Sequence, residues 1–117
     1  MPSVTVRNIN SPDATRSFPR GKLNVVTVSG VTFDRHVLEP GWKWSECNKP
    51  LRKTESCQGP HNCYVVSGRL HVVMDNGEEA DIGPGDVAVI APGHDAWVAG
   101  NETCIFIGFS GIPNYVE

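Results

Sequence analysis

Short runs of hydrophobic and β-branched residues recur along the chain, and each is bounded by Gly, Pro, Asn or Asp. No run keeps a helical period over four turns, whereas several alternate apolar and polar residues as a half-buried strand does. The pattern therefore predicts an all-β protein. We expect strands over Val4–Arg7, Leu23–Val28, Val31–Leu38, Cys63–Val66, Leu70–Met74, Glu79–Ile82, Val87–Ile90, Asp95–Ala99 and Cys104–Phe109.

Turn residues separate these strands. Asp75-Asn76-Gly77 is a hairpin signal, because Asn-Gly supplies the positive φ angles that a tight primed turn requires. Ser67-Gly68 predicts another tight reversal, which would pair Tyr64–Ser67 with Leu70–Met74 as an antiparallel hairpin. Many short strands, 12 glycines and 9 prolines favour a sandwich or barrel over βαβ units.

The segment from Trp44 to His61 interrupts this order. It has little strand pattern and contains two prolines, so we expect a long loop, and long loops in compact domains are often functional. Cys47, Cys57 and Cys63 lie within 17 positions of one another in and beside it.

Length and charge limit the function classes. A chain of 117 residues and 12.7 kDa predicts one domain, residues 1–117. It carries 10 Lys and Arg against 13 Asp and Glu, and no basic run is longer than two residues, which argues against a nucleic-acid partner. We find no apolar signal core and no apolar stretch of membrane-spanning length, and we expect a cytoplasmic protein with no membrane partner. Its four cysteines are then reduced, and can be metal ligands, core residues or reactive thiols.

Four short motifs resemble, in their order along the chain, sequence motifs of the cupin family. They are Leu38-Glu39-Pro40-Gly41, Tyr64-Val65-Val66-Ser67-Gly68, Gly83-Pro84-Gly85-Asp86-Val87 and Ala91-Pro92-Gly93-His94. The resemblance implies a double-stranded β-helix, or jelly-roll barrel, with its core at roughly residues 31–110 and an N-terminal strand segment in residues 1–30.

Three further motifs look like those of small bacterial cupins of unknown function. They are Pro-Gly-Trp-Lys-Trp-Ser-Glu from Pro40, Ser-Cys-Gln from Ser56 and Gly-His-Asp-Ala-Trp from Gly93. This resemblance implies no particular reaction.

The cupin motifs usually place three histidines and a glutamate inside the barrel, and this chain departs from that pattern. Counting back from Gly68 places His61 at the glutamate position, and counting forward from Gly41 places Cys47 at the first histidine. In the second motif Ala96 replaces the histidine, while His94, two residues earlier, would face the same side of a strand.

The resemblance therefore implies a modified site inside the barrel. Its candidate metal ligands are Cys57, His61 and His94, with either Cys47 or Glu55 as a fourth; Glu55 and Cys57 are spaced like a His-x-His pair. Thiolate and imidazole donors suit a divalent transition metal, zinc before iron or copper.

Simpler roles exist for each of these residues. Cys57 could fill a gap under the loop, His61 could be a core histidine, and His94 could cap the turn before it. Glu55 reads most simply as a solvated charge. Cys63 and Cys104 lie in predicted strands and are expected in the core, and His71 is expected on the opposite sheet face or at the rim.

The three tryptophans have a separate interpretation. We expect Trp42 and Trp44 to hold the loop against the barrel, and Trp97 to form an aromatic wall for a small organic ligand beside His94.

Three function classes follow. The first is a metal-dependent enzyme or binding protein acting on a small molecule. The second is a metal-free cupin that binds a small ligand, and the third is a thiol-based sensor that uses Cys47 and Cys57. We also expect a homodimer, because Val4–Arg7 would otherwise leave an unpaired edge strand.

Overall fold

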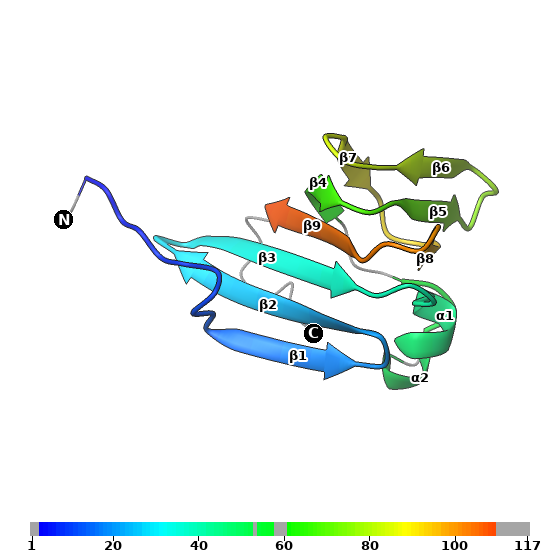
Figure 1. The fold of residues 1–117 in the computed structure, drawn as a ribbon, viewed down its shortest axis with the longest axis horizontal. Coiled ribbons are helices and arrows are strands. Elements are labelled where there is room, and N and C mark those ends of the chain that lie inside the picture. Colours follow the sequence, from blue (N-terminus) through cyan, green and yellow to red (C-terminus); the bar gives the residue numbers. More distant parts are fainter. Residues whose placement is uncertain (1–2, 53, 58–60, 110–117) are drawn as a thin grey trace.

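A computed structural model describes residues 3–52, 54–57 and 61–109 of the chain. Its strands are β1 (Ala14–Phe18), β2 (Gly21–Val28), β3 (Val31–Leu38), β4 (His61–Ser67), β5 (Leu70–Met74), β6 (Glu79–Ile82), β7 (Val87–Ile90), β8 (His94–Val98) and β9 (Cys104–Phe109). They form a six-stranded sheet in the order β1-β2-β3-β9-β4-β7 and a three-stranded sheet in the order β6-β5-β8 (Figure 1). Every pairing of these strands is antiparallel, and the all-β prediction is confirmed.

The core lies between the two sheets. Val65 of β4 and Phe106 of β9 come from the larger sheet, and Val72 of β5 and Val98 of β8 come from the smaller one. Each contributes roughly 1.5–3 kcal/mol by leaving water. Inward and outward residues alternate along the strands, as the pleat requires. Cys63 and Cys104 are 3% and 0% exposed, which confirms their expected place in the core.

The first strand differs from the prediction. Val4–Arg7 forms no strand, and the sheet begins instead at β1, which was not predicted. Val4 and Val6 are 76% and 80% exposed, so nothing in the described chain covers their apolar side chains. Arg7 is held by its ion pair with Asp13 at 2.6 Å rather than by a strand neighbour. The other eight predicted strands are present, with ends that agree within two residues.

The predicted hairpin between Tyr64–Ser67 and Leu70–Met74 is wrong. β4 pairs with β7 and β9 in the larger sheet, whereas β5 pairs with β6 and β8 in the smaller one. Gly68, with φ of 75°, turns the chain from one sheet into the other. The second predicted turn is present: Gly77 has φ of 95°, and its N–H donates to the Met74 carbonyl oxygen at 2.9 Å between β5 and β6. It is not of the predicted primed type, because Asn76 has no positive φ.

The predicted long loop contains two short helices, α1 (Trp44–Cys47) and α2 (Lys49–Arg52), so its description as loop is wrong for these residues. Trp42 and Trp44 are buried, and the Trp42 indole N–H donates to Asn48 Oδ1 at 2.8 Å. These contacts confirm that the two tryptophans hold the segment against the sheets. Neither helix is long and apolar enough to cross a membrane, nor is any other helix in the described ranges.

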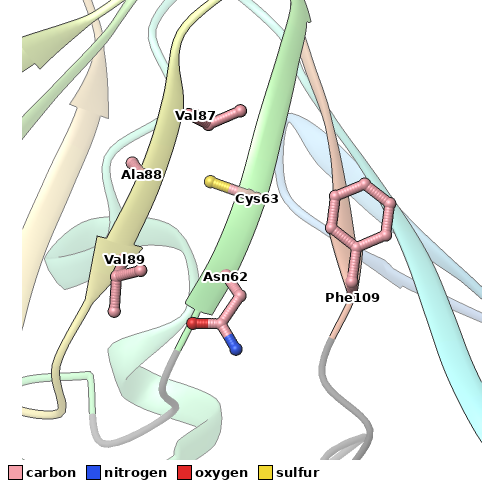
Figure 2. A pocket seen from close by; sticks show the side chains of 6 residues that line it. All are labelled: Asn62, Cys63, Val87, Ala88, Val89 and Phe109. Atoms are coloured by element: carbon pink, nitrogen blue, oxygen red, sulfur yellow. The ribbon is translucent and has the colours of Figure 1, made fainter.

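The outer face of the larger sheet is apolar around β4, β7 and β9. Tyr64, Val66, Val87, Val89 and Phe109 are each more than 40% exposed there. A hollow of about 220 Å³ opens along β7 and β4, with side chains of both strands and of β9 around it (Figure 2). Apolar surface of this kind is typical of an interaction site.

Candidate metal centre

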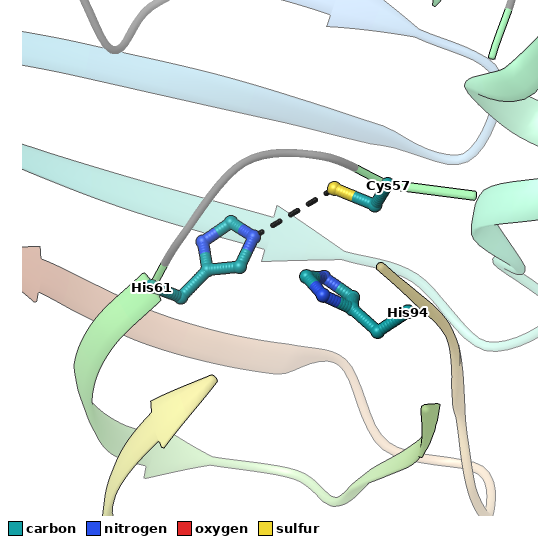
Figure 3. Close-up of side chains that lie close together, drawn as sticks. All are labelled: Cys57, His61 and His94. Carbon is teal, nitrogen blue, oxygen red and sulfur yellow. Dashed lines mark hydrogen bonds between the residues drawn. The ribbon is translucent and has the colours of Figure 1, made fainter. Parts of the chain in front are cut away.

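Three potential ligands meet where the two sheets come together. Cys57 Sγ and one ring nitrogen each of His61 and His94 all lie within 4.8 Å of one another (Figure 3). Cys57 Sγ is 3.9 Å from His61 Nε2. The structure thus brings together three of the five predicted ligands, and Cys47, which the cupin register placed at the first histidine position, is not among them.

Backbone pairing fixes the positions of these three residues. His61 begins β4 in the larger sheet, and His94 begins β8 in the smaller one. Cys57 forms an isolated β-bridge with His94, in which the Cys57 N–H donates to the His94 carbonyl oxygen at 2.7 Å. The neighbouring Ser56 hydroxyl donates to Asp75 Oδ2 at 2.8 Å, which anchors the segment beside β5.

One hydrogen bond selects the tautomer of His94. Its Nδ1 lies 2.9 Å from the Ala91 carbonyl oxygen. A carbonyl oxygen can only accept, so Nδ1 carries the proton and Nε2 keeps its lone pair. Metal-binding histidines commonly have such a partner on the other nitrogen. The predicted capping of the turn and a ligand role are therefore compatible.

Burial keeps both histidines neutral. It lowers the pKa of His94, and together with the nearby His36 and His94 it lowers the pKa of His61 well below the usual histidine range. A neutral imidazole can bind a cation without first losing a proton.

The core thiols behave differently. Burial raises the pKa of Cys63 and of Cys104 to about 11, so both remain protonated at neutral pH. A protonated thiol in the core is a poor metal ligand, because the thiolate is the form that binds.

The two candidates for a fourth ligand lie elsewhere. Cys47 is buried in α1 among core side chains, with 6% exposure. Glu55 points into solvent, with a side chain that is 94% exposed and 3.3 Å from Lys49 Nζ. Neither belongs to the group of potential ligands in the described chain. Cys47 is held in the core by α1, and Glu55 lies in an exposed bend after α2.

Trp97 does not share a face with His94. Along β8, His94 and Ala96 are buried, whereas Trp97 between the inward positions is half-buried on the other face. The Trp97 ring contacts the His71 ring, with 4.8 Å between the two centroids. Lys43 Nζ lies 5.0 Å from the centroid of the Trp97 ring. His71 is therefore on the outer face, as expected, and Trp97 is beside it instead of at the site.

The sequence interpretation missed His36. Its ring lies edge-on to that of His61, at 5.6 Å between centroids, and stacks on Phe106 at 4.3 Å. Thr32, Asp34, His36 and Leu38 form the inner row of β3, and the apolar Val31 faces outward. Alternation reveals which residues share a face but not which face is buried, so it gave no reason to select His36.

The donor set fits a borderline transition-metal ion. One sulfur and two neutral imidazole nitrogens are ligands that zinc prefers, whereas magnesium or calcium would require mostly oxygen. Such a centre can hold and polarise a small molecule at a remaining coordination position.

Comparisons with known proteins agree with this fold. The family model described as the EutQ-like cupin domain matches residues 39–106. A protein of unknown function from Rhizobium leguminosarum superposes with a TM-score of 0.66 at 20% identity, over 92% of this chain and 95% of that chain. An uncharacterized conserved protein with a double-stranded beta-helix domain from Klebsiella pneumoniae gives 0.61 at 19%, over 94% and 91%.

A putative ethanolamine utilization protein Q from Salmonella typhimurium has a TM-score of 0.52 at 17% identity, over 76% of this chain and 67% of that chain. A search of curated proteins finds no match. At these identities the structural likeness establishes the fold alone. The family model, however, spans more than half of the chain, and the chain therefore belongs to the EutQ-like cupin domain family.

Proposed function

We propose that this protein is a metal-binding cupin in which Cys57, His61 and His94 hold one divalent transition-metal ion, and in which that ion binds or activates a small molecule. The observation that carries the proposal is the convergence of three ligand atoms within 4.8 Å from three separate segments. The Ala91 hydrogen bond supports it, because it leaves His94 Nε2 available as a ligand.

Zinc is the proposed metal. A thiolate beside imidazoles suits zinc, and iron and copper are the alternatives that the same donors accept. Three protein ligands leave a fourth position on a tetrahedral ion, to be filled by another donor, by water or by the small molecule.

Metal content tests the proposal. Protein purified without a histidine tag and under reducing conditions should contain about one metal ion per chain by elemental analysis. Cys57→Ala, His61→Ala and His94→Ala should each lower this content markedly. His71→Ala is the matched control, because its ring lies on the outer sheet face. Full metal content in His61→Ala would refute the assignment.

A thiol-based sensor is the second candidate. Cys57 is only partly buried, and its sulfur lies 3.9 Å from His61 Nε2, an arrangement that can activate a thiol. The sensor that pairs Cys47 with Cys57 receives less support, because Cys47 is buried in the core. Two results together would favour this candidate: the purified protein contains no metal, and peroxide oxidises Cys57.

The proposal includes a setting for the protein. A thiolate ligand requires reducing conditions, which agrees with the expected cytoplasmic location. The exposed apolar residues around β4, β7 and β9 support the expected homodimer, with β7 at the edge of its sheet.

A further inference from the structure

Asp34 is a carboxylate buried in the core, a place where a charged side chain requires partners. It lies on β3 with 1% exposure, and its Oδ1 has no hydrogen-bond partner in the described parts of the chain. A buried charge is costly unless it is paired or contributes to a metal site. The backbone leaves room for this carboxylate, because a Cβ on the facing Gly108 would collide with it.

The neighbouring His36 also has a buried polar atom without a hydrogen bond. Its Nδ1 is buried without a hydrogen-bond partner in the same described ranges, although it lies 3.1 Å from Asp34 Oδ1. The two atoms are within reach of each other but are not aligned as a hydrogen bond. A modest rotation of the imidazole would let Nδ1–H donate to the carboxylate and satisfy both atoms.

His36 also lies beside the candidate centre. The centroid of the His61 ring lies 5.2 Å from that of His94 and 5.6 Å from that of His36. Two imidazoles on one tetrahedral zinc have centroids roughly 5 Å apart, since each Zn–N bond is about 2 Å long. Both spacings are close to this value.

We infer that His36 is a fourth donor to the metal centre and that Asp34 holds its other ring nitrogen, an inference that rests on the proposed function. A carboxylate bound to the second nitrogen of a metal-binding histidine fixes the tautomer and makes the imidazole a better donor. Phe106 stacks on the His36 ring with an interplanar angle of 10° and limits its movement.

Charge supports the same arrangement. A divalent ion bound by one thiolate and neutral imidazoles keeps one positive charge, which the Asp34 carboxylate would balance in the buried interior. His36 itself lies outside the group of ligand atoms within 4.8 Å of one another. As a fourth donor it would have to move its ring closer to the other three ligands, by sliding parallel to the stacked Phe106 ring.

Cobalt(II) provides the test, because its visible d–d bands report coordination and its sulfur charge-transfer band reports Cys57. Metal-free wild type, His36→Phe, Asp34→Asn and the control His71→Gln are titrated with Co²⁺ under reducing conditions, with a competing chelator to measure affinity. Phenylalanine keeps an aromatic ring on Phe106 but removes both nitrogens.

We expect His36→Phe to weaken Co²⁺ binding about tenfold or more and to shift the d–d bands, while the sulfur band persists. Asp34→Asn should weaken binding by about tenfold, and His71→Gln should match wild type. Wild-type affinity and bands in His36→Phe would overturn the inference. Should that variant fail to fold by circular dichroism, wild-type affinity and bands in Asp34→Asn would overturn it instead.

The outcome separates the inference from the proposed function. If Cys57→Ser and His61→Ala lose Co²⁺ binding while His36→Phe keeps wild-type affinity, only the role of His36 is contradicted. Absence of Co²⁺ binding to wild type would contradict both.

Discussion

His71 contacts two carboxylates on the outer face of the smaller sheet. Its Nδ1 lies 2.6 Å from Asp81 Oδ1, and its Nε2 lies 2.7 Å from Glu79 Oε1. Hydrogen bonds to Asp81 and then to Glu79 raise the pKa of His71 above its usual value. His71 of β5 thus contacts two carboxylates of β6, one with each ring nitrogen.

His71→Gln should therefore change the pH dependence of stability. The folded pKa is raised above the unfolded value of about 6.5, so the contribution is fully present below that pH and is lost as the pH rises through the folded pKa. Urea unfolding at several pH values should show the largest loss of stability in the variant near pH ~6, and a smaller loss at alkaline pH. A difference that grows with pH would contradict this account.

Cys104 illustrates a thiol with a packing role. It is 0% exposed, and burial raises its pKa to about 11. Cys104→Ala should lower the free energy of unfolding by roughly 1 kcal/mol through the cavity that it leaves, without changing the metal content. Chemical denaturation and elemental analysis of the same sample check both parts. Loss of metal in this variant would show that the core thiols contribute to the centre.

At the residue scale, the cupin register selected one residue inside the group of potential ligands and one residue outside it. Counting from Gly68 selected His61, and strand alternation related His94 to the usual histidine position. Counting from Gly41 selected Cys47, which lies away from the group because the chain after Gly41 forms a helix that spacing does not reveal. Glu55 was selected only by its spacing from Cys57, and it points into solvent. His36 was missed because its strand alternates on both faces without indicating which face is buried.

At the scale of elements, Gly68 is the corner between the sheets. It has φ of 75°, and an added Cβ would lie 2.5 Å from the Cys104 Cα and from the Thr103 carbonyl oxygen. Backbone atoms cannot move aside as a flexible side chain can. Gly77 offers a matched comparison, with φ of 95° and no atom within 4 Å of an added Cβ.

Gly68→Ala should therefore cost more than Gly77→Ala. The second change adds only backbone strain, roughly 1 kcal/mol, whereas the first adds a steric collision worth a further ~2 kcal/mol or more. Chemical denaturation of the two variants measures the difference. Equal losses would mean that the chain does not pass this closely over the start of β9.

The same corner explains the wrong hairpin. Ser67-Gly68 correctly indicated a change of direction, but turn residues do not specify whether the next strand stays in the same sheet. That choice is made by long-range pairing, here of β4 with β9 and of β5 with β8. Val4–Arg7 failed for a related reason, since β-branched residues favour a strand only where a neighbour is present to pair with them.

On the scale of the whole molecule, the proposed homodimer makes a direct prediction. Val87 and Val89 are 77% and 84% exposed on β7, the edge strand of the larger sheet. Wild type should sediment as a dimer, and the double change Val87→Lys and Val89→Lys should give a folded monomer, because charged side chains oppose apolar packing and edge pairing. A wild-type monomer that is independent of concentration would refute the dimer.

The overall architecture was the most predictable level. Short alternating runs and turn residues were sufficient to predict an all-β protein, and the cupin motifs supplied the jelly roll that the patterns alone left open between a sandwich and a barrel. Activity is not determined at this level, because the same fold carries many sites. The chemistry must therefore be established at the centre itself.

X-ray absorption at the metal edge of untagged, reduced protein reports directly which atoms bind the metal. We expect one sulfur neighbour, from Cys57, at about 2.3 Å from the metal, and nitrogen neighbours, from the imidazoles, at about 2.0 Å. In Cys57→Ser the sulfur neighbour should disappear. A wild-type spectrum without a sulfur neighbour, or protein that yields no metal edge at all, would contradict a cysteine–histidine metal centre.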